Sequence, residues 1–282
     1  MTIAKSALTN SPTSRETVSL TGRFGYGARG VIYLLVGISA GRATFDPSHR
    51  PGGFTESLEF LGHHWTGAVA LGLLAAGMAC FACWLAASAV YRRDHPGPAH
   101  LVLVAGLLGD AAIYLGFMVS VLGIIFGASR GSEHLLQSWV SWLVAGTVGR
   151  IIVGLASATI LACGAGLVAW GIFADIEGPL ELPSAEKRLM LPIGRYGTAG
   201  RGLAIALVGC YLLISAIRAD ASQAHELGGA LRDLRALPYG VVITAAFALA
   251  FIASSALDFV VAIYRRFDPG RHRSPNRRRR RS

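Results

Sequence analysis

The stretch GRFGYGARGVIYLLVG at residues 22–37 decides how this chain folds, because residues 194–209 read GRYGTAGRGLAIALVG. Eight of the sixteen positions are identical at a constant offset of 172 residues. A match of this length at one fixed spacing indicates an internal repeat. Each copy opens an apolar stretch and places an arginine, Arg29 or Arg201, just inside it. The sequence therefore predicts a recurring helical unit, and by itself it does not reveal a biochemical activity.

The composition is typical of an integral membrane protein. Hydrophobic residues make up 53% of the 282 residues, charged residues make up 15%, and the mean hydropathy is +0.51. In a soluble domain about a quarter of the residues are charged. A membrane-spanning helix needs about 20 mainly apolar residues, because hydrocarbon offers its backbone no hydrogen-bond partners. The clean apolar runs are 65–91, 111–129 and 151–174, and three less clean runs are 26–43, 201–217 and 237–263. Their length and number argue against the core of a soluble protein.

The repeat continues beyond its opening and sets the expected architecture. The triplet Tyr-Arg-Arg occurs at 91–93 and again at 264–266, and a weaker middle copy aligns Gly25 with Gly106 and Tyr33 with Tyr114 at an offset of 81. The sequence therefore predicts an all-α polytopic membrane protein with six transmembrane helices. An even helix count in each unit makes the three helical-hairpin repeats parallel, and a pseudo-threefold bundle is our hypothesis for their arrangement. The expected units are a cytoplasmic N-terminal segment (1–21), repeat 1 (22–93), repeat 2 (101–175), repeat 3 (194–267) and a basic cytoplasmic tail (268–282).

The distribution of lysine and arginine predicts the orientation. If both termini lie on one side, that side carries 17 of these residues outside the spans, and the other side carries 7. Positive charge concentrates on the cytoplasmic side of membrane proteins, so we expect cytoplasmic termini and a bacterial inner-membrane location. Residues 1–21 show no pattern of a cleavable signal peptide. On the opposite side, the spaced leucines of 54–65 and 227–238 predict short amphipathic helices at the interface, with Leu58 aligned with Leu231.

Charged residues within the spans are the most informative candidates for a site. Asp110 takes the place of Arg29 and Arg201 in the middle copy, and Asp258 lies six residues before Tyr264. If its helix begins near residue 101, Asp110 lies about 13 Å deep, too far for a short side chain to reach the headgroups. We expect the two arginines and two aspartates to form a buried charge network, because an unpaired charge there is costly. Structural pairing and a proton or ion pathway are the two interpretations, and snorkelling is an alternative for the arginines.

Small residues account better than chemistry for the other motifs. Glycines at the start of repeats 1 and 3 allow close helix packing. These glycines are Gly22, Gly25, Gly30, Gly194, Gly197 and Gly202. Cys80 and Cys83 share one helical face, but no further ligand stands at a suitable spacing, so we interpret them as packing residues. We expect no catalytic set, no metal and no cofactor.

The basic tail predicts contact with lipid. Its run consists of Arg277, Arg278, Arg279, Arg280 and Arg281. Anionic headgroups on the cytoplasmic face attract such a run by about 1 kcal/mol per charge. Nucleic-acid binding is the alternative, but no stacking aromatic residues accompany the run, so no nucleic acid is expected.

The repeated opening G-R-[FY]-G-x-x-x-R-G…V-G, the helix pairs and the Tyr-Arg-Arg endings resemble the bacterial DUF1206 family of integral membrane proteins. The resemblance covers about residues 20–267 and is weakest in the middle copy, where Asp110 replaces the arginine. It implies three repeats of two transmembrane helices, and it transfers no catalytic residue. We expect a non-enzymatic structural or interaction protein in the lipid bilayer, with protein partners unknown. The alternatives are a conduit for a small solute, an ion or protons, and then an enzyme acting on lipid.

Overall fold

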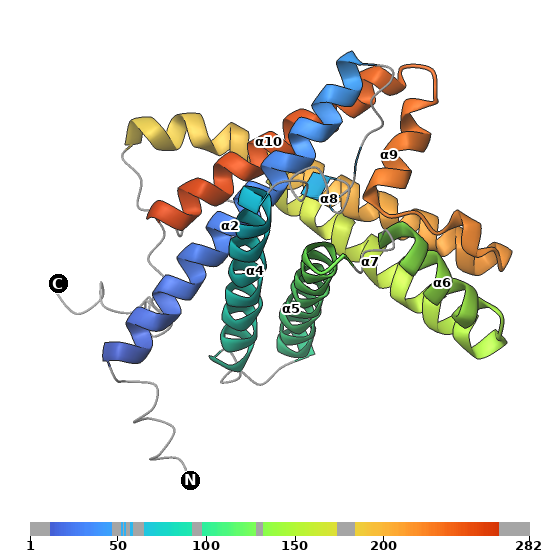
Figure 1. Ribbon diagram of the computed structural model, residues 1–282, viewed down its shortest axis with the longest axis horizontal. Coiled ribbons are helices and arrows are strands. Elements are labelled where there is room, and N and C mark those ends of the chain that lie inside the picture. Colours follow the sequence, from blue (N-terminus) through green and yellow to red (C-terminus); the bar gives the residue numbers. More distant parts are fainter. Residues whose placement is uncertain are drawn as a thin grey trace, which may run out of the picture.

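The computed structural model describes residues 12–46, 52, 54, 57–58, 65–91, 98–127, 132–173 and 184–264. Within these ranges every regular element is a helix, so the predicted all-α class is confirmed. The elements in chain order are α2 (Pro12–Phe45), α4 (Trp65–Tyr91), α5 (Pro98–Ile125), α6 (Ser132–Val144), α7 (Thr147–Phe173), α8 (Ser184–Arg218), η2 (Ala221–Gln223), α9 (Leu227–Arg235) and α10 (Gly240–Tyr264). Figure 1 shows the long helices crossing one another, with the short helices α6 and α9 beside them.

Five of the helices are long and apolar enough to cross a membrane, which identifies a polytopic helical membrane protein. These stretches are Gly67–Ala89, Gly106–Ile125, Thr147–Phe173, Met190–Arg218 and Gly240–Tyr264, judged by length and composition among the described residues. The remaining predicted span, residues 26–43, lies in α2. This helix is continuous, but it does not reach the apolarity of the other five. Arg29 and Arg42 within the expected stretch account for this difference.

The second helices of repeats 1 and 3 end at equivalent residues, whereas their first helices begin earlier than expected. α4 and α10 end at Tyr91 and Tyr264, the equivalent tyrosines of the two Tyr-Arg-Arg triplets. α2 and α8 begin at Pro12 and Ser184, about ten residues before the repeat motif, so part of the expected N-terminal segment 1–21 is helical. At 34 and 35 residues these two helices are about 51 and 52 Å long, longer than the roughly 30 Å hydrocarbon core.

The helices contact one another in a cyclic order. α4 packs against α5, α7 against α8, and α10 against α2, so the second helix of each repeat lies on the first helix of the next. Within repeats 1 and 3 the two helices also pack together, α2 on α4 and α8 on α10. A pseudo-threefold bundle would have this order. The middle repeat departs from it, because α5 and α7 form no comparable interface in their described residues.

Glycines show the same contrast at equivalent positions within the repeats. A Cβ atom added to Gly25 would lie 2.7 Å from Phe81 Cα, and one added to Gly197 would lie 2.6 Å from the backbone nitrogen of Ser254. Both positions therefore need glycine for their helix pair to approach this closely. At Gly106, the middle counterpart, an added Cβ would meet nothing within 4 Å. The seam between α5 and α7 is open where the other two hairpins are closed.

Contacts between repeats fix the register of the middle copy. A Cβ on Gly30 would touch Phe259 of α10, and one on Gly202 would touch Leu167 of α7. Leu167 stands 92 residues before Phe259 in the chain. The same spacing separates the neighbours of the next glycines along these helices, Ile252 for Gly37 and Ile160 for Gly209. α7 and α10 are therefore equivalent helices with an offset of 92 residues. Of the other glycines predicted to pack, Gly22 is buried and Gly194 faces Leu257.

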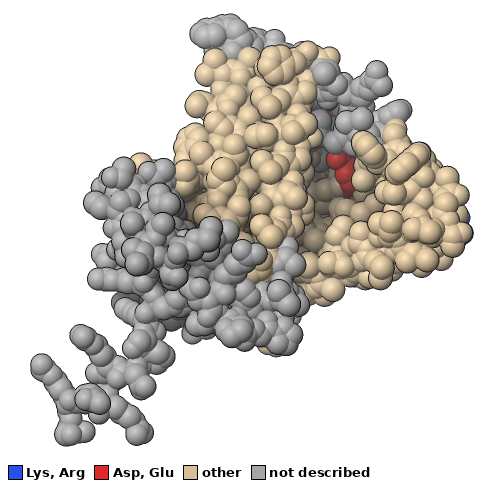
Figure 2. All heavy atoms as spheres, turned by 90° about the horizontal axis from the view of Figure 1, so that it is seen from below, with Lys and Arg blue, Asp and Glu red and all other residues tan. Residues whose placement is uncertain are grey.

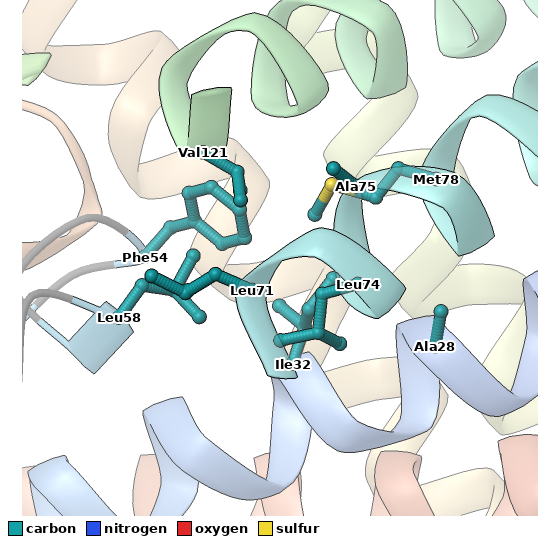
Figure 3. Packing of buried hydrophobic residues seen from close by; sticks show 9 residues of the cluster. All are labelled: Ala28, Ile32, Phe54, Leu58, Leu71, Leu74, Ala75, Met78 and Val121. Carbon is teal, nitrogen blue, oxygen red and sulfur yellow. The ribbon is translucent and has the colours of Figure 1, made fainter. Parts of the chain in front are cut away.

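The leucines of the predicted amphipathic segments are anchored in the core. Leu58 is fully buried with Ile32, Leu71 and Val121, in a cluster that joins α2, α4 and α5 (Figure 3). Leu231 of α9 is fully buried in a separate cluster formed by α2, α8 and α10. The short helix predicted in 227–238 is present as α9, which covers the helices with its apolar side, and most of 54–65 lies outside the described residues.

Candidate functional site

A salt bridge joins the first repeat to the third. The Arg29 guanidinium of α2 donates through Nε to Asp258 Oδ2 of α10 at 2.8 Å, and its Nη2 donates to Asp258 Oδ1. The Asp258 side chain is only 2% exposed and the Arg29 side chain 14%. A two-pronged contact of this kind matches the planar guanidinium to the planar carboxylate. Each charge is thus neutralised by the other inside the bundle.

Aromatic rings enclose the same guanidinium. Arg29 Cζ lies 4.6 Å from the ring centre of Tyr26 and 4.8 Å from that of Phe81. The two rings are themselves in edge-to-face contact, with centres 5.0 Å apart. Ring faces attract a cation, so they stabilise Arg29 where water is scarce. The repeat pattern offered no signal for these two residues, because their equivalents in repeat 3 are Thr198 and Ser254.

Two tyrosines that are equivalent in the repeat meet beside the salt bridge. The Tyr33 and Tyr114 hydroxyl oxygens, from α2 and α5, lie 3.5 Å apart. The Tyr33 ring stacks on Phe251 and lies 5.6 Å from Arg201 Cζ. In the sequence these tyrosines align at an offset of 81 residues. That alignment indicated that they occupy equivalent positions in repeats 1 and 2.

Arg201 and Asp110 remain without the partner that Arg29 has. Neither side chain forms a hydrogen bond or ion pair with any residue that the structure describes. Asp110 is exposed and stands one helical turn before Tyr114, whose hydroxyl meets that of Tyr33. Figure 2 draws one face of the molecule, on which the described residues are mainly uncharged and atoms of acidic residues lie in a hollow. The structure thus brings one of the expected charge pairs into contact and leaves Asp110 and Arg201 without a bonded partner among the described residues.

Equivalent positions explain this difference. Asp258 of α10 corresponds to Gly166 of α7 and to Leu85 of α4. The counterpart of Asp258 on α7 is thus an exposed glycine without a carboxylate, and an added Cβ at Gly166 would meet nothing within 4 Å. Leu85, which is buried, offers no charge to Asp110. Of three equivalent places for a charge pair, only one is complete.

The structure also bears on metal binding, on the cysteine pair and on the basic tail. Among the described residues no group of three or more histidine, cysteine or acidic side chains could hold one metal ion. Cys80 and Cys83 of α4 are both free thiols. The basic tail with Arg277–Arg281 lies outside the described residues.

Comparison with known proteins agrees with the repeat. The family model described as Domain of Unknown Function (DUF1206) matches residues 24–92 and 196–265, which are the first and third hairpins. The chain is also similar to the uncharacterized protein YxxB of Bacillus subtilis (strain 168), with 24% identity over 248 residues, or 86% of this chain and 90% of that protein. No solved structure matches. The first and third hairpins therefore each match the DUF1206 family model, and the resemblance expected from the sequence is confirmed for these two segments.

Proposed function

We propose that this protein is a non-enzymatic structural or interaction component of the bacterial cytoplasmic membrane. The observation that carries the proposal is the buried salt bridge between Arg29 and Asp258. Both oxygens of Asp258 accept from Arg29, so the buried charge of Asp258 is used to hold repeat 1 against repeat 3. A carboxylate held in this way is poorly suited to exchange protons with a passing solute.

The lipid-facing side of the middle repeat supports a role in interaction. α5 and α7 carry many exposed large apolar side chains, among them Ile113 and Val119 on α5 and Ile151 and Leu155 on α7. In a bilayer these surfaces meet acyl chains or another transmembrane segment. Association in that environment depends on close packing, and the unengaged glycines of both helices permit it.

The test separates a structural from a transporting role. The purified protein and its Asp258→Asn variant are compared by thermal unfolding in detergent and by proton and small-ion flux after reconstitution into vesicles. We expect the variant to lose stability, and the wild type to leave the vesicles no leakier than empty ones. A wild-type flux that the variant abolishes while staying folded would contradict the structural role.

A conduit is the second candidate, and the unpaired charges favour it. Neither Asp110 nor Arg201 has a bonded partner among the described residues, and a mobile ion or proton needs charged groups that are free to exchange partners. Asp110→Asn should then reduce proton flux while leaving thermal stability unchanged. Equal flux in wild type and variant would exclude a pathway through Asp110.

The orientation is proposed from charge. The excess of lysine and arginine on one side supports cytoplasmic N- and C-termini. The number of crossings makes this testable, because six spans place both termini on one side and five place them on opposite sides. Reporters fused to each terminus, active only in the cytoplasm or only outside it, should both report cytoplasm. Opposite readings would mean that α2 does not cross.

The tail is proposed to bind anionic lipid. Vesicles that contain phosphatidylglycerol should retain a peptide of residues 268–282 at low salt and release it at high salt, because screening weakens the attraction. Equal retention by vesicles of phosphatidylcholine alone would refute the assignment.

A further inference from the structure

The place beside Arg201 has the features of an incomplete charge pair. Arg29 and Arg201 occupy the same position in two copies of one repeat, and the helices around them pack with the same register. Arg29 is neutralised by Asp258, whereas the corresponding position of α7, the helix that packs on α8, is Gly166. The missing group is therefore an oxyanion presented toward a guanidinium.

A second unpaired charge lies close by and has the opposite sign. Asp110 of α5 is exposed and stands one helical turn before Tyr114, whose hydroxyl lies 3.5 Å from that of Tyr33, the ring beside Arg201. No ion pair joins Asp110 and Arg201 in the described part of the chain. A ligand with only an anion would leave Asp110 unpaired next to it, and a ligand with only a cation would leave Arg201 unpaired. One molecule carrying both charges satisfies both side chains.

The surroundings suit such a molecule. The Tyr33 ring lies against Arg201, and the hydroxyls of Tyr33 and Tyr114 are 3.5 Å apart, a weak contact that leaves them able to bond a ligand. α5 and α7 do not pack on each other in their described residues, and an added Cβ at Gly106 of α5 would meet nothing within 4 Å. The exposed apolar residues of these two helices would accommodate acyl chains.

We propose that Arg201 and Asp110 form a binding site for a zwitterion that carries a primary ammonium and a phosphate or carboxylate. The oxyanion bonds the Arg201 guanidinium in the place that Asp258 takes at Arg29. The ammonium donates hydrogen bonds to the Asp110 carboxylate. This chemistry occurs in the headgroup of an ethanolamine phospholipid and in free small zwitterions. The site goes beyond the structural role, because binding at equilibrium requires no transport.

The experiment measures binding to the full-length protein in detergent. Native mass spectrometry with added phosphatidylethanolamine, phosphatidylglycerol or phosphatidylcholine tests the lipid source, and isothermal titration with O-phosphoethanolamine tests the free one. We expect saturable binding of an ethanolamine compound and weaker binding of the other two lipids. Binding by phosphatidylethanolamine alone identifies a lipid site, and binding by O-phosphoethanolamine as well identifies a site for the headgroup chemistry. Binding of neither, or equal binding of phosphatidylglycerol, overturns the proposal.

Variants test the position of the site. Gly166→Asp supplies the missing carboxylate, so it should raise the unfolding temperature and weaken ligand binding by about tenfold or more. Gly166→Asn has nearly the same size without the charge and should retain binding within about twofold. Arg201→Gln should lose binding whatever its stability, which thermal unfolding measures separately. Unchanged binding in folded Arg201→Gln, or equal binding in Gly166→Asp and Gly166→Asn, would place the ligand elsewhere.

Discussion

The salt bridge between Arg29 and Asp258 allows a quantitative prediction. Asp258→Asn keeps the size of the side chain but removes the charge that neutralises Arg29. The pair is nearly inaccessible, with 14% and 2% of the two side chains exposed, so solvent cannot replace the lost partner. Breaking a buried pair on one side costs about 3–5 kcal/mol, because it leaves an uncompensated charge. For a chain of this size, that corresponds to a decrease in unfolding temperature on the order of 10 °C.

The double variant separates the worth of the pair from the cost of an orphan charge. Arg29→Met combined with Asp258→Leu replaces both charges by apolar groups, and such replacements are often neutral or stabilising by about 1–4 kcal/mol. We therefore expect the double variant to be at least as stable as the wild type. The assay is equilibrium unfolding in detergent followed by tryptophan fluorescence, arranged as a double-mutant cycle.

The chain offers a matched control for the same chemical change. Asp110→Asn also converts an aspartate to an amide within a helix, but Asp110 is exposed and has no bonded partner among the described residues. It should alter stability by less than about 0.5 kcal/mol. The reasoning is refuted if Asp258→Asn costs no more than this control, or if the double variant is no more stable than Asp258→Asn.

Three further predictions concern packing and the loop after α8. Gly25→Ala should destabilise by about 1–3 kcal/mol because its Cβ would overlap Phe81, whereas Gly27→Ala, whose Cβ meets nothing within 4 Å, should gain about 0.5–1 kcal/mol of helix stability; thermal unfolding of the two variants compares them. Leu231→Ala removes a fully buried side chain and should cost about 2–5 kcal/mol in chemical denaturation, and a cost below that of an exposed leucine would contradict the burial. Hydrogen bonds from Ser222 hold the pKa of Asp220 below its ordinary value of 3.8. The turn at η2 is therefore stabilised above pH 3.8 and loses that support as the pH falls below it, which the amide hydrogen exchange of Ser222 would report.

The repeat made most of the fold predictable from the sequence. The two Tyr-Arg-Arg triplets, 173 residues apart, predicted equivalent ends for two helices, and α4 and α10 end at Tyr91 and Tyr264. The early starts of α2 and α8 were not foreseen, because their first turns are polar and lack the apolar run on which the prediction depended. Tertiary packing does not require a helix to end where hydrocarbon ends.

The candidate site was predictable only in part. Charges placed deep in apolar spans indicated that Arg29 needs a carboxylate, but two aspartates were available. The choice of Asp258 follows from the cyclic order of the helices, in which α10 lies on α2. The sequence did not indicate that α5 and α7 are not packed on each other. Gly106 aligns with Gly25, but only at Gly25 would an added Cβ meet a neighbouring helix. A sequence position states which residue is present, and not whether a partner helix reaches it.

The span of chain between the two members of the salt bridge bears on biogenesis. They are 229 residues apart, and a ribosome adds about 5–20 residues per second, so the guanidinium waits on the order of 10–50 s for its carboxylate to be made. The first helix is also the least apolar of the long ones. Until α10 is made, Arg29 has no carboxylate to neutralise it within the bilayer. A nascent chain that stops before the last helix would therefore carry an unpaired charge at a position where such a charge is costly.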